Sequence, residues 1–300
     1  MPRRARNEAV VVLGQRKLLQ RLGPGLVHAI VFWGFLVLAP TIVMALLGAV
    51  DGDWTVPWLD SQGWFALLVD VFAGLVLVGV AAAVWIRKVQ RPERFSGSHL
   101  READLILALI AGIVTTLLLW HATRISLGLS EWPASWSPVA NTLSSLFGEG
   151  TATEILERAF VWAHVAIILG FLVYLPHSKH LHIATAAVNV WFGRTRAPGR
   201  LEPLDFTVED EAAMRFGSAT IADMTWKQMV DTMSCTECGR CQDVCPAYAT
   251  GKELSPKLLI MGLRDQLLAE GPALLAAAEA ELSPLVPNAV TDEVVWDCVT

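Results

Sequence analysis

Residues 26–50 read LVHAIVFWGFLVLAPTIVMALLGAV, an apolar run without a single Asp, Glu, Lys or Arg. Three further runs share this character, with Asp70 as their one residue of those four types: Gly63 to Ile86, Leu105 to Thr123 and Ala159 to Pro176. A helix needs about 17 to 25 apolar residues to cross a bilayer, and lipid offers the backbone no hydrogen-bond partner outside a helix. The sequence therefore predicts an all-α fold with a four-helix transmembrane bundle.

The composition fits such a chain. Of 300 residues, 54% are hydrophobic and 17% are charged, and the mean hydropathy is +0.47. These values exclude a disordered chain, a collagen-like chain and a small disulfide-rich protein. Residues 1–200 carry 17 Lys and Arg against 12 Asp and Glu, whereas residues 201–300 carry 6 against 17. The chain therefore joins two unlike regions, and we expect no nucleic-acid partner for its acidic end.

Charges between the apolar runs predict how the chain lies in a plasma membrane. Residues 1–24 hold six Lys and Arg, and the connection between the second and third runs holds five, from Arg87 to Arg101. The two other connections lack Lys and Arg over residues 51–62 and 125–157. Because Lys and Arg accumulate on the cytoplasmic side, we expect a multi-pass protein with both termini in the cytoplasm. Residues 8–22 are expected to form a basic amphipathic helix on the inner surface.

Four of the five cysteines form one compact motif, Cys235-Thr-Glu-Cys238-Gly-Arg-Cys241-Gln-Asp-Val-Cys245-Pro246. The C-x2-C-x2-C-x3-C-P spacing is typical of [4Fe-4S] binding, because a tightly curled backbone directs three thiolates at one cubane and the proline turns the fourth away. Disulfides are not expected on the cytoplasmic side of a membrane. The alternatives are a zinc ribbon, which would need paired C-x2-C knuckles, and unbound thiols.

The fifth cysteine bears on the number of clusters. In two-cluster proteins the fourth thiolate of this motif ligates the other cluster. Cys245 would therefore need three further cysteine ligands to complete that second cluster. Cys298, two residues before the end, is the one cysteine left. We interpret it as the start of a second motif, so that two 4Fe-4S clusters are completed beyond residue 300 in a longer polypeptide. Alternatively, Cys298 is a structural thiol, and another ligand completes a single cluster.

Four histidines of the apolar region are candidate axial ligands of haem b. His164 and His182 are 18 residues apart, so on one continuous helix they would project from the same face, about 27 Å apart. His28 lies near the inner end of the first run and His121 near the outer end of the third. Matched depths predict two pairs, His28 with His182 and His121 with His164, each holding one haem iron between two neutral imidazoles.

Other interpretations of these histidines stay open. A membrane histidine can equally be a packing residue that is bonded to a backbone carbonyl. His177 or His180 could replace His182 on the inner side, since Pro176 can bend the helix.

Other polar and small residues in and next to the apolar runs carry weaker signals. Asp70 either handles quinone protons or is hydrogen-bonded to a neighbouring helix. Arg124, one turn after His121, is a candidate partner of haem propionates. Gly74 and Gly79 are expected to serve helix packing.

Together these features divide the chain into four parts. They are a basic amphipathic cytoplasmic segment (1–24), a four-helix transmembrane dihaem domain (25–185), a linker (186–219), and an α-helical ferredoxin-type domain (220–300) that is truncated at its second cluster motif.

The stretch Leu175-Pro176-His177-Ser178-Lys179-His180-Leu181-His182, preceded by His164, resembles the last helix of the cytochrome b (gamma) subunit of respiratory nitrate reductases. The resemblance implies that His164 and His182 ligate two different haems. That subunit carries both remaining ligands on one helix, ten residues apart, whereas Leu38 stands ten residues after His28. The resemblance therefore extends to His28 and not to His121.

The soluble part is similar to the heterodisulfide-reductase-related iron-sulfur oxidoreductases, and most similar to their membrane forms of actinobacterial type. The similar stretches are Met224-Thr-Trp-Lys-Gln-Met, the cysteine motif, and Gly251-Lys-Glu-Leu-Ser-Pro-Lys-Leu-Leu-Ile-Met-Gly-Leu-Arg264. In that family a second cluster motif follows, and Trp296-Asp-Cys298-Val-Thr fits its start. Cysteine-rich repeats then bind a further catalytic cluster.

The resemblance implies a quinone-linked iron-sulfur oxidoreductase whose catalytic part lies beyond residue 300. Electrons would pass from a cytoplasmic donor, reduced electron-transfer flavoprotein, through 4Fe-4S clusters and two b haems to menaquinone in the lipid membrane. One alternative is a heterodisulfide, glycerol-3-phosphate or 2-hydroxy-acid oxidoreductase that is linked to the quinone pool. The other is a membrane iron-sulfur sensor without haem.

Overall fold

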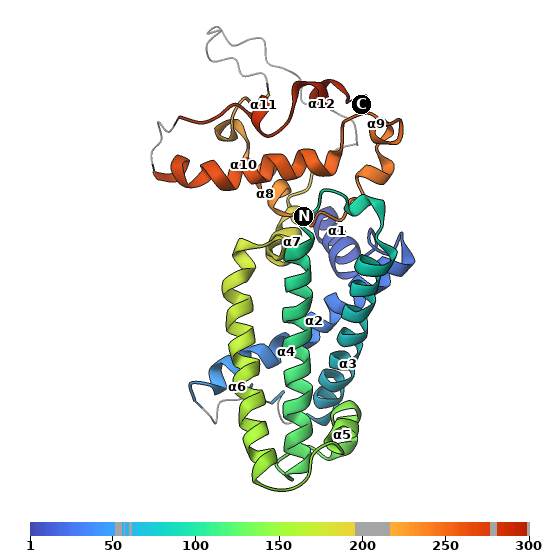
Figure 1. Cartoon of the computed structure of the whole chain (residues 1–300), viewed down its shortest axis with the longest axis vertical. Helices are drawn as coiled ribbons and strands as arrows, with labels where there is room; N and C mark the ends of the chain where they lie inside the picture. Colours follow the sequence, from blue (N-terminus) through green and yellow to red (C-terminus); the bar gives the residue numbers. More distant parts are fainter. Residues whose placement is uncertain (52–55, 57, 60–61, 196–216, 277–280, 299–300) are drawn as a thin grey trace. The chain divides into compact units, whose positions relative to one another are not determined.

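The computed structural model describes residues 1–51, 56, 58–59, 62–195, 217–276 and 281–298, which form helices and connections with no strand among them (Figure 1). The chain splits into two compact units, each discontinuous in sequence. We call one the bundle unit, made of Gln15–Arg91 and Leu100–Ser178. The other is the cysteine unit, made of Met1–Gly14, Pro92–His99 and Lys179–Thr300.

The bundle unit contains four helices long and apolar enough to cross a membrane, which confirms the predicted fold class. They are α2 (Leu22–Gly48), α3 (Gly63–Trp85), α4 (Leu100–Ser126) and α6 (Thr151–Tyr174). Helical turns continue α3 as far as Gln90. Each helix begins at its apolar run or up to eight residues before it, because polar residues at the ends of a spanning helix can still complete its turns in the interface.

Close backbone approach brings α2 and α3 together. A Cβ added at Gly34 of α2 would lie 2.2 Å from Cγ2 of Val76 on α3, and one added at Gly79 would lie 3.1 Å from Cγ2 of Val31. Gly74, by contrast, faces Val139 of the short helix α5 (Pro138–Ser144). The packing role expected of Gly74 and Gly79 is therefore confirmed.

Asp70 has a structural role in the bundle. Its side chain is 1% exposed, and its two carboxylate oxygens accept hydrogen bonds from the backbone N–H groups of Val139 at 2.6 Å and Ala140 at 2.9 Å. These N–H groups belong to the first turn of α5, which has no intrahelical acceptor for them. Asp70 therefore connects α5 to α3. Of its two predicted roles, the structure supports hydrogen bonding to a neighbouring helix.

The last bundle helix ends earlier than the sequence analysis expected. The chain leaves α6 after Tyr174, passes through a 3-10 turn at Leu175–His177, and is extended at Ser178 (φ −129°, ψ 163°). A new helix, α7 (His182–Trp191), starts at His182. The continuous helix predicted to carry both His164 and His182 is therefore wrong, because the chain departs from helical geometry at Ser178, two residues after Pro176.

The cysteine unit begins with helix α1 (Pro2–Asn7), followed by a π-helical segment, Glu8–Leu13, that ends at Gly14. The expected continuous helix over residues 8–22 is thus interrupted. Helix α1 packs against α7, where the Arg4 guanidinium bonds to the Trp191 carbonyl and lies 5.9 Å from the centre of the Phe192 ring. The basic start of the chain is therefore folded onto α7.

The further α-helices of the cysteine unit among the described residues are α8 (Trp226–Met233), α9 (Pro246–Ala249), α10 (Pro256–Ala276), α11 (Leu285–Asn288) and α12 (Asp292–Trp296). Ile221, Leu267 and Leu285 form their buried apolar core. Residues 196–216 of the predicted linker, and the last two residues of the chain, lie outside the described residues.

The buried side of α10 is partly apolar and partly charged. Met261 and Leu267 are buried, whereas Leu258 and Leu268 are 45% and 56% exposed. Lys257 and Arg264 are also buried. Spacings of four and seven residues place Lys257, Met261, Arg264 and Leu267 on adjoining turns of one face, so two cations share the core-facing side of α10.

Candidate functional site

Helix α8 leads directly into the cysteine motif. Its start is fixed by a capping box, in which Thr225 Oγ1 accepts from the Gln228 N–H at 3.3 Å and the Thr225 N–H donates to Gln228 Oε1 at 2.8 Å. The helix ends at Met233, and Cys235 follows after Ser234. The first cysteine therefore leaves a helix whose two ends are both defined.

Residues 235–241, which we call the cysteine loop, curl tightly. Glu237 and Gly239 both have left-handed backbone conformations, with φ of 58° and 71°. The curl turns three backbone N–H groups toward three sulfurs. The donors are Glu237 for Cys235, Arg240 for Cys238 and Gln242 for Cys241. Backbone N–H groups directed at sulfur stabilise thiolate, the form of cysteine that binds iron.

The surroundings of the thiols shift their pKa values in different directions. Burial raises the pKa of the Cys235 thiol. Burial alone would also raise the pKa of Cys238, but hydrogen bonds from the N–H and side chain of Arg240, together with its charge, outweigh burial and lower that pKa. Burial and the charges of Cys238 and Cys235 raise the pKa of the Cys241 thiol. The three sulfurs therefore share one site, and the residues present fit a cluster with three thiolate ligands from this loop.

Cys245 and Cys298 take other positions in the cysteine unit. Cys245 immediately precedes α9, with Pro246 as the first helical residue. Cys298 follows α12 and is exposed. None of the five cysteines, all of which the structure describes, forms a disulfide. The assignment of Cys235, Cys238, Cys241, Cys245 and Cys298 as ligands of two clusters stays a prediction.

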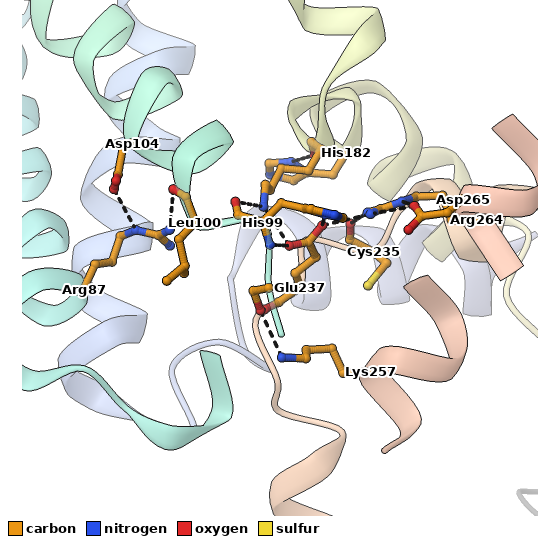
Figure 2. A network of polar contacts seen from close by, with 12 residues as sticks. Arg87, His99, Leu100, Asp104, His182, Cys235, Glu237, Lys257, Arg264 and Asp265 are labelled. Carbon is orange, nitrogen blue, oxygen red and sulfur yellow. Dashed lines mark hydrogen bonds and ion pairs between the residues drawn. The ribbon is translucent and has the colours of Figure 1, made fainter. Parts of the chain in front are cut away.

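A buried carboxylate lies inside the cysteine loop (Figure 2). Glu237 is 2% exposed and accepts four hydrogen bonds, two of them from His99. Lys179 Nζ donates to Oε2 and Arg264 to Oε1, both at 2.8 Å. Burial alone would raise the pKa of Glu237, but the hydrogen bonds from Lys179, His99 and Arg264 outweigh it and lower the pKa to about 2. The carboxylate is therefore charged and fully paired.

The loop Pro92–His99 packs against the cysteine loop. Lys257 reaches across it, donating to the Arg94 carbonyl at 3.0 Å, to the Ser96 carbonyl, and to Ser98 Oγ at 3.0 Å. A Cβ at Gly239 would lie 2.5 Å from the Arg94 carbonyl oxygen, so only glycine fits there. The segment that separates α3 from α4 in sequence therefore belongs structurally to the cysteine site.

Glu237, Lys257 and Arg264 were not predicted as site residues. Glu237 occupies an unspecified position of the cysteine motif, and the two cations stand in a stretch otherwise rich in apolar residues. The available signal was the seven-residue spacing of Lys257 and Arg264, which puts both on one helix face.

In the bundle unit, His164 of α6 is 1% exposed and faces the middle of α4. Its Nδ1 lies 2.9 Å from the Ile113 carbonyl oxygen and 3.1 Å from Thr116 Oγ1. Because a carbonyl can only accept, Nδ1 carries the proton, and Nε2 of the neutral ring keeps its lone pair. Nε2 is buried and has no hydrogen-bond partner among the described residues. A histidine with Nδ1 held by a carbonyl and Nε2 available is the usual form of a metal ligand.

The other candidate histidines have different surroundings. His121 lies on α4 five residues after Thr116, a rise of about 7.5 Å, with its ring 5.3 Å from that of Trp120. His28 Nδ1 is 3.0 Å from Gln15 Oε1. Arg124, the candidate partner of a haem propionate, lies 3.6 Å from Glu157 and 3.7 Å from Glu131.

His182 belongs to the cysteine unit, where its Nδ1 donates to the Lys179 carbonyl at 2.9 Å. The ring of His180 is 5.1 Å away. His28 belongs to the bundle unit, as does His177, which is exposed. The predicted haem pairs, and the choice between His182 and its two neighbours, stay predictions.

Comparison with known proteins places a 4Fe-4S binding domain at residues 226–247, which span α8 and the cysteine loop. The chain is 31% identical to a probable iron-sulfur-binding oxidoreductase, FadF, of Bacillus subtilis, over 97% of this chain and 45% of the relative. It is 32% identical to the EtfAB:quinone oxidoreductase of Syntrophomonas wolfei, over 96% of this chain and 44% of the relative.

A further relative is a probable membrane-anchored ferredoxin of Chromohalobacter salexigens, 27% identical over 54% of this chain and 27% of the relative. No solved structure matches. The chain spans about half the length or less of the curated relatives it matches. It is therefore an all-α chain with four candidate membrane helices and a 4Fe-4S binding domain, homologous to proteins named as iron-sulfur oxidoreductases.

Proposed function

We propose that the chain is the membrane part and first cluster-binding part of an oxidoreductase that transfers electrons from a cytoplasmic donor to a quinone. The observation that carries the proposal is His164, a buried histidine with an available Nε2, in the membrane bundle of a chain with a 4Fe-4S binding domain. Clusters and b haems supply one-electron transfer, which connects a soluble donor to a lipid-soluble acceptor.

The chain's own residues would hold these groups. Cys235, Cys238 and Cys241 supply thiolates, and the curled loop directs its N–H groups at them. In the bundle, Ile113 and Thr116 orient His164 by holding Nδ1, so that Nε2 would be available to bind a haem iron. His28, His121 and His182 are the further proposed ligands, two for each of two haems.

The donor and acceptor are proposed from chemistry and relatedness. The EtfAB:quinone oxidoreductase relative favours reduced electron-transfer flavoprotein as the donor and a quinone as the acceptor, and we take menaquinone as that quinone. The distribution of Lys and Arg favours a plasma-membrane location with both termini in the cytoplasm, where a soluble flavoprotein reaches the cysteine unit.

A spectroscopic experiment tests the haem part of the proposal. The detergent-purified protein should give a b-type α band in reduced-minus-oxidised spectra and two haems per chain by quantitative haem assay. His164→Ala would remove one proposed haem ligand, so we expect one haem of the two to be lost. Trp162→Ala is the matched control, because Trp162 stands two residues away on α6 and is 62% exposed.

The possible results are distinct. One haem in His164→Ala and two in Trp162→Ala support the ligand assignment. A flat difference spectrum of the wild-type protein, or two haems in His164→Ala, contradicts it.

A further inference from the structure

Lys257 is the most deeply buried large polar side chain of the cysteine unit. It is 1% exposed, and its acceptors are the Arg94 and Ser96 carbonyls and the Ser98 hydroxyl. Removing an ammonium group from water costs several kcal/mol unless negative charge compensates it. Its hydrogen-bond acceptors are uncharged, so they satisfy its N–H groups without neutralising its charge.

Glu237, the carboxylate whose charge acts on Lys257, already has its own partners. Glu237 is paired with Lys179 and Arg264 and bonded twice by His99. Burial lowers the pKa of Lys257, whereas the charges of Glu237 and of the thiols Cys235, Cys238 and Cys241 act in the opposite direction. The positive charge of Lys257 is therefore held within electrostatic range of all three sulfurs.

The loop Pro92–His99 keeps that charge in place. Ser98 Oγ accepts from Lys257 Nζ at 3.0 Å and donates to the Glu237 carbonyl at 3.2 Å, so one hydroxyl joins the lysine to the cysteine loop. Gly97 (φ 76°) lies against Leu258, the residue after Lys257. The acceptors of Lys257 thus come from a segment that contacts both the cysteine loop and α10.

We propose that Lys257 is the counter-charge of the cluster held by Cys235, Cys238 and Cys241, and that the loop Pro92–His99 positions it there. A thiolate-ligated cubane is anionic, and reduction by one electron adds a further negative charge. A fixed buried cation stabilises the reduced form more than the oxidised form, so Lys257 raises the reduction potential of the cluster. The inference rests on the proposed function only in requiring a cluster at these cysteines.

A redox titration of the purified protein, followed by the EPR signal of the reduced cluster, tests the inference. In Lys257→Gln the amide still donates hydrogen bonds to the loop, but the charge is gone. We expect the ratio of reduced to oxidised cluster at a fixed potential to fall about tenfold, which is about 59 mV for a one-electron couple. Lys227→Gln is the control, because Lys227 has a carboxylate partner, Asp231, at 2.6 Å.

A second pair of variants leaves Lys257 in place. Ser98→Asp puts a carboxylate beside the ammonium group and should lower the ratio as Lys257→Gln does. Asn has nearly the same shape as Asp but no charge. In Ser98→Asn the ratio of reduced to oxidised cluster should therefore stay within threefold of the wild type. Lys257→Gln and Ser98→Asp could also lose their iron. If they do, while Ser98→Asn and Lys257→Arg keep normal iron, the result supports a counter-charge that the cluster needs.

Two results would count against different claims. Ratios within threefold of the wild type in iron-loaded Lys257→Gln or Ser98→Asp overturn the inference about Lys257 and leave the proposed function standing. Absence of iron and sulfide from the wild-type protein itself overturns the proposed cluster.

Discussion

Glu237 stands between two cysteines of the motif, and its backbone and side chain serve different purposes. The left-handed backbone (φ 58°) lets the loop curl, while the carboxylate gathers partners from the loop before α4, the turn before α7, and α10. A side chain that pairs with three separate segments fixes their mutual arrangement. A motif spacing alone specifies the cysteines and cannot reveal such a residue between them.

Glu237→Ala is expected to destabilise the cysteine unit strongly. Lys179 and Arg264 are mostly buried and would lose their shared carboxylate, a change that costs about 3–5 kcal/mol when a buried pair is broken. Thermal unfolding followed by circular dichroism, with iron content measured in parallel, checks this. Glu93→Ala, an exposed carboxylate of the same unit, should change stability by less than about 0.5 kcal/mol. Equal melting temperatures for Glu237→Ala and the wild type would show that the network adds no stability.

At the scale of elements, the contact between α2 and α3 depends on Gly34. Gly34→Ile would drive a side chain into Val76, so we expect a loss of about 1–3 kcal/mol in the free energy of unfolding in micelles. Val76→Ala removes the obstructing methyl groups, and the double variant should recover part of that loss. Gly170→Ala on α6 has open space around its Cβ and should be neutral or slightly stabilising. Additive effects of Gly34→Ile and Val76→Ala would contradict direct packing of these residues.

The helices differ in how well their sequences predict them. The four spanning helices follow from length and hydropathy, because lipid permits no other structure over such apolar runs. The break after α6 depends on whether Pro176 bends or ends the helix, which neighbouring structure decides. The buried face of α10 was missed because two of its members, Lys257 and Arg264, are cations that only a paired or anionic site makes tolerable.

At the scale of the molecule, the account needs the cysteine unit on the cytoplasmic side. We expect a green-fluorescent-protein fusion after residue 300 to fluoresce and an alkaline-phosphatase fusion there to be inactive. The matched fusions after Glu149, in the connection between α4 and α6, should behave in the opposite way, because that connection carries no Lys or Arg between residues 125 and 157. Active phosphatase at residue 300 would contradict this orientation, because the cysteine unit would then lie on the opposite side of the membrane from a cytoplasmic donor.

Reoxidation by quinone is the measurement that tests electron transfer from the cysteine unit to the membrane most directly. The purified protein is reduced anaerobically, excess reductant is removed, and a menaquinone analogue is added while the cluster EPR signal and the b-type α band are recorded. The account predicts that both signals are lost in the wild type and that loss of the cluster signal is at least tenfold slower in His164→Ala. A cluster that stays reduced in the wild type after quinone is added would contradict it.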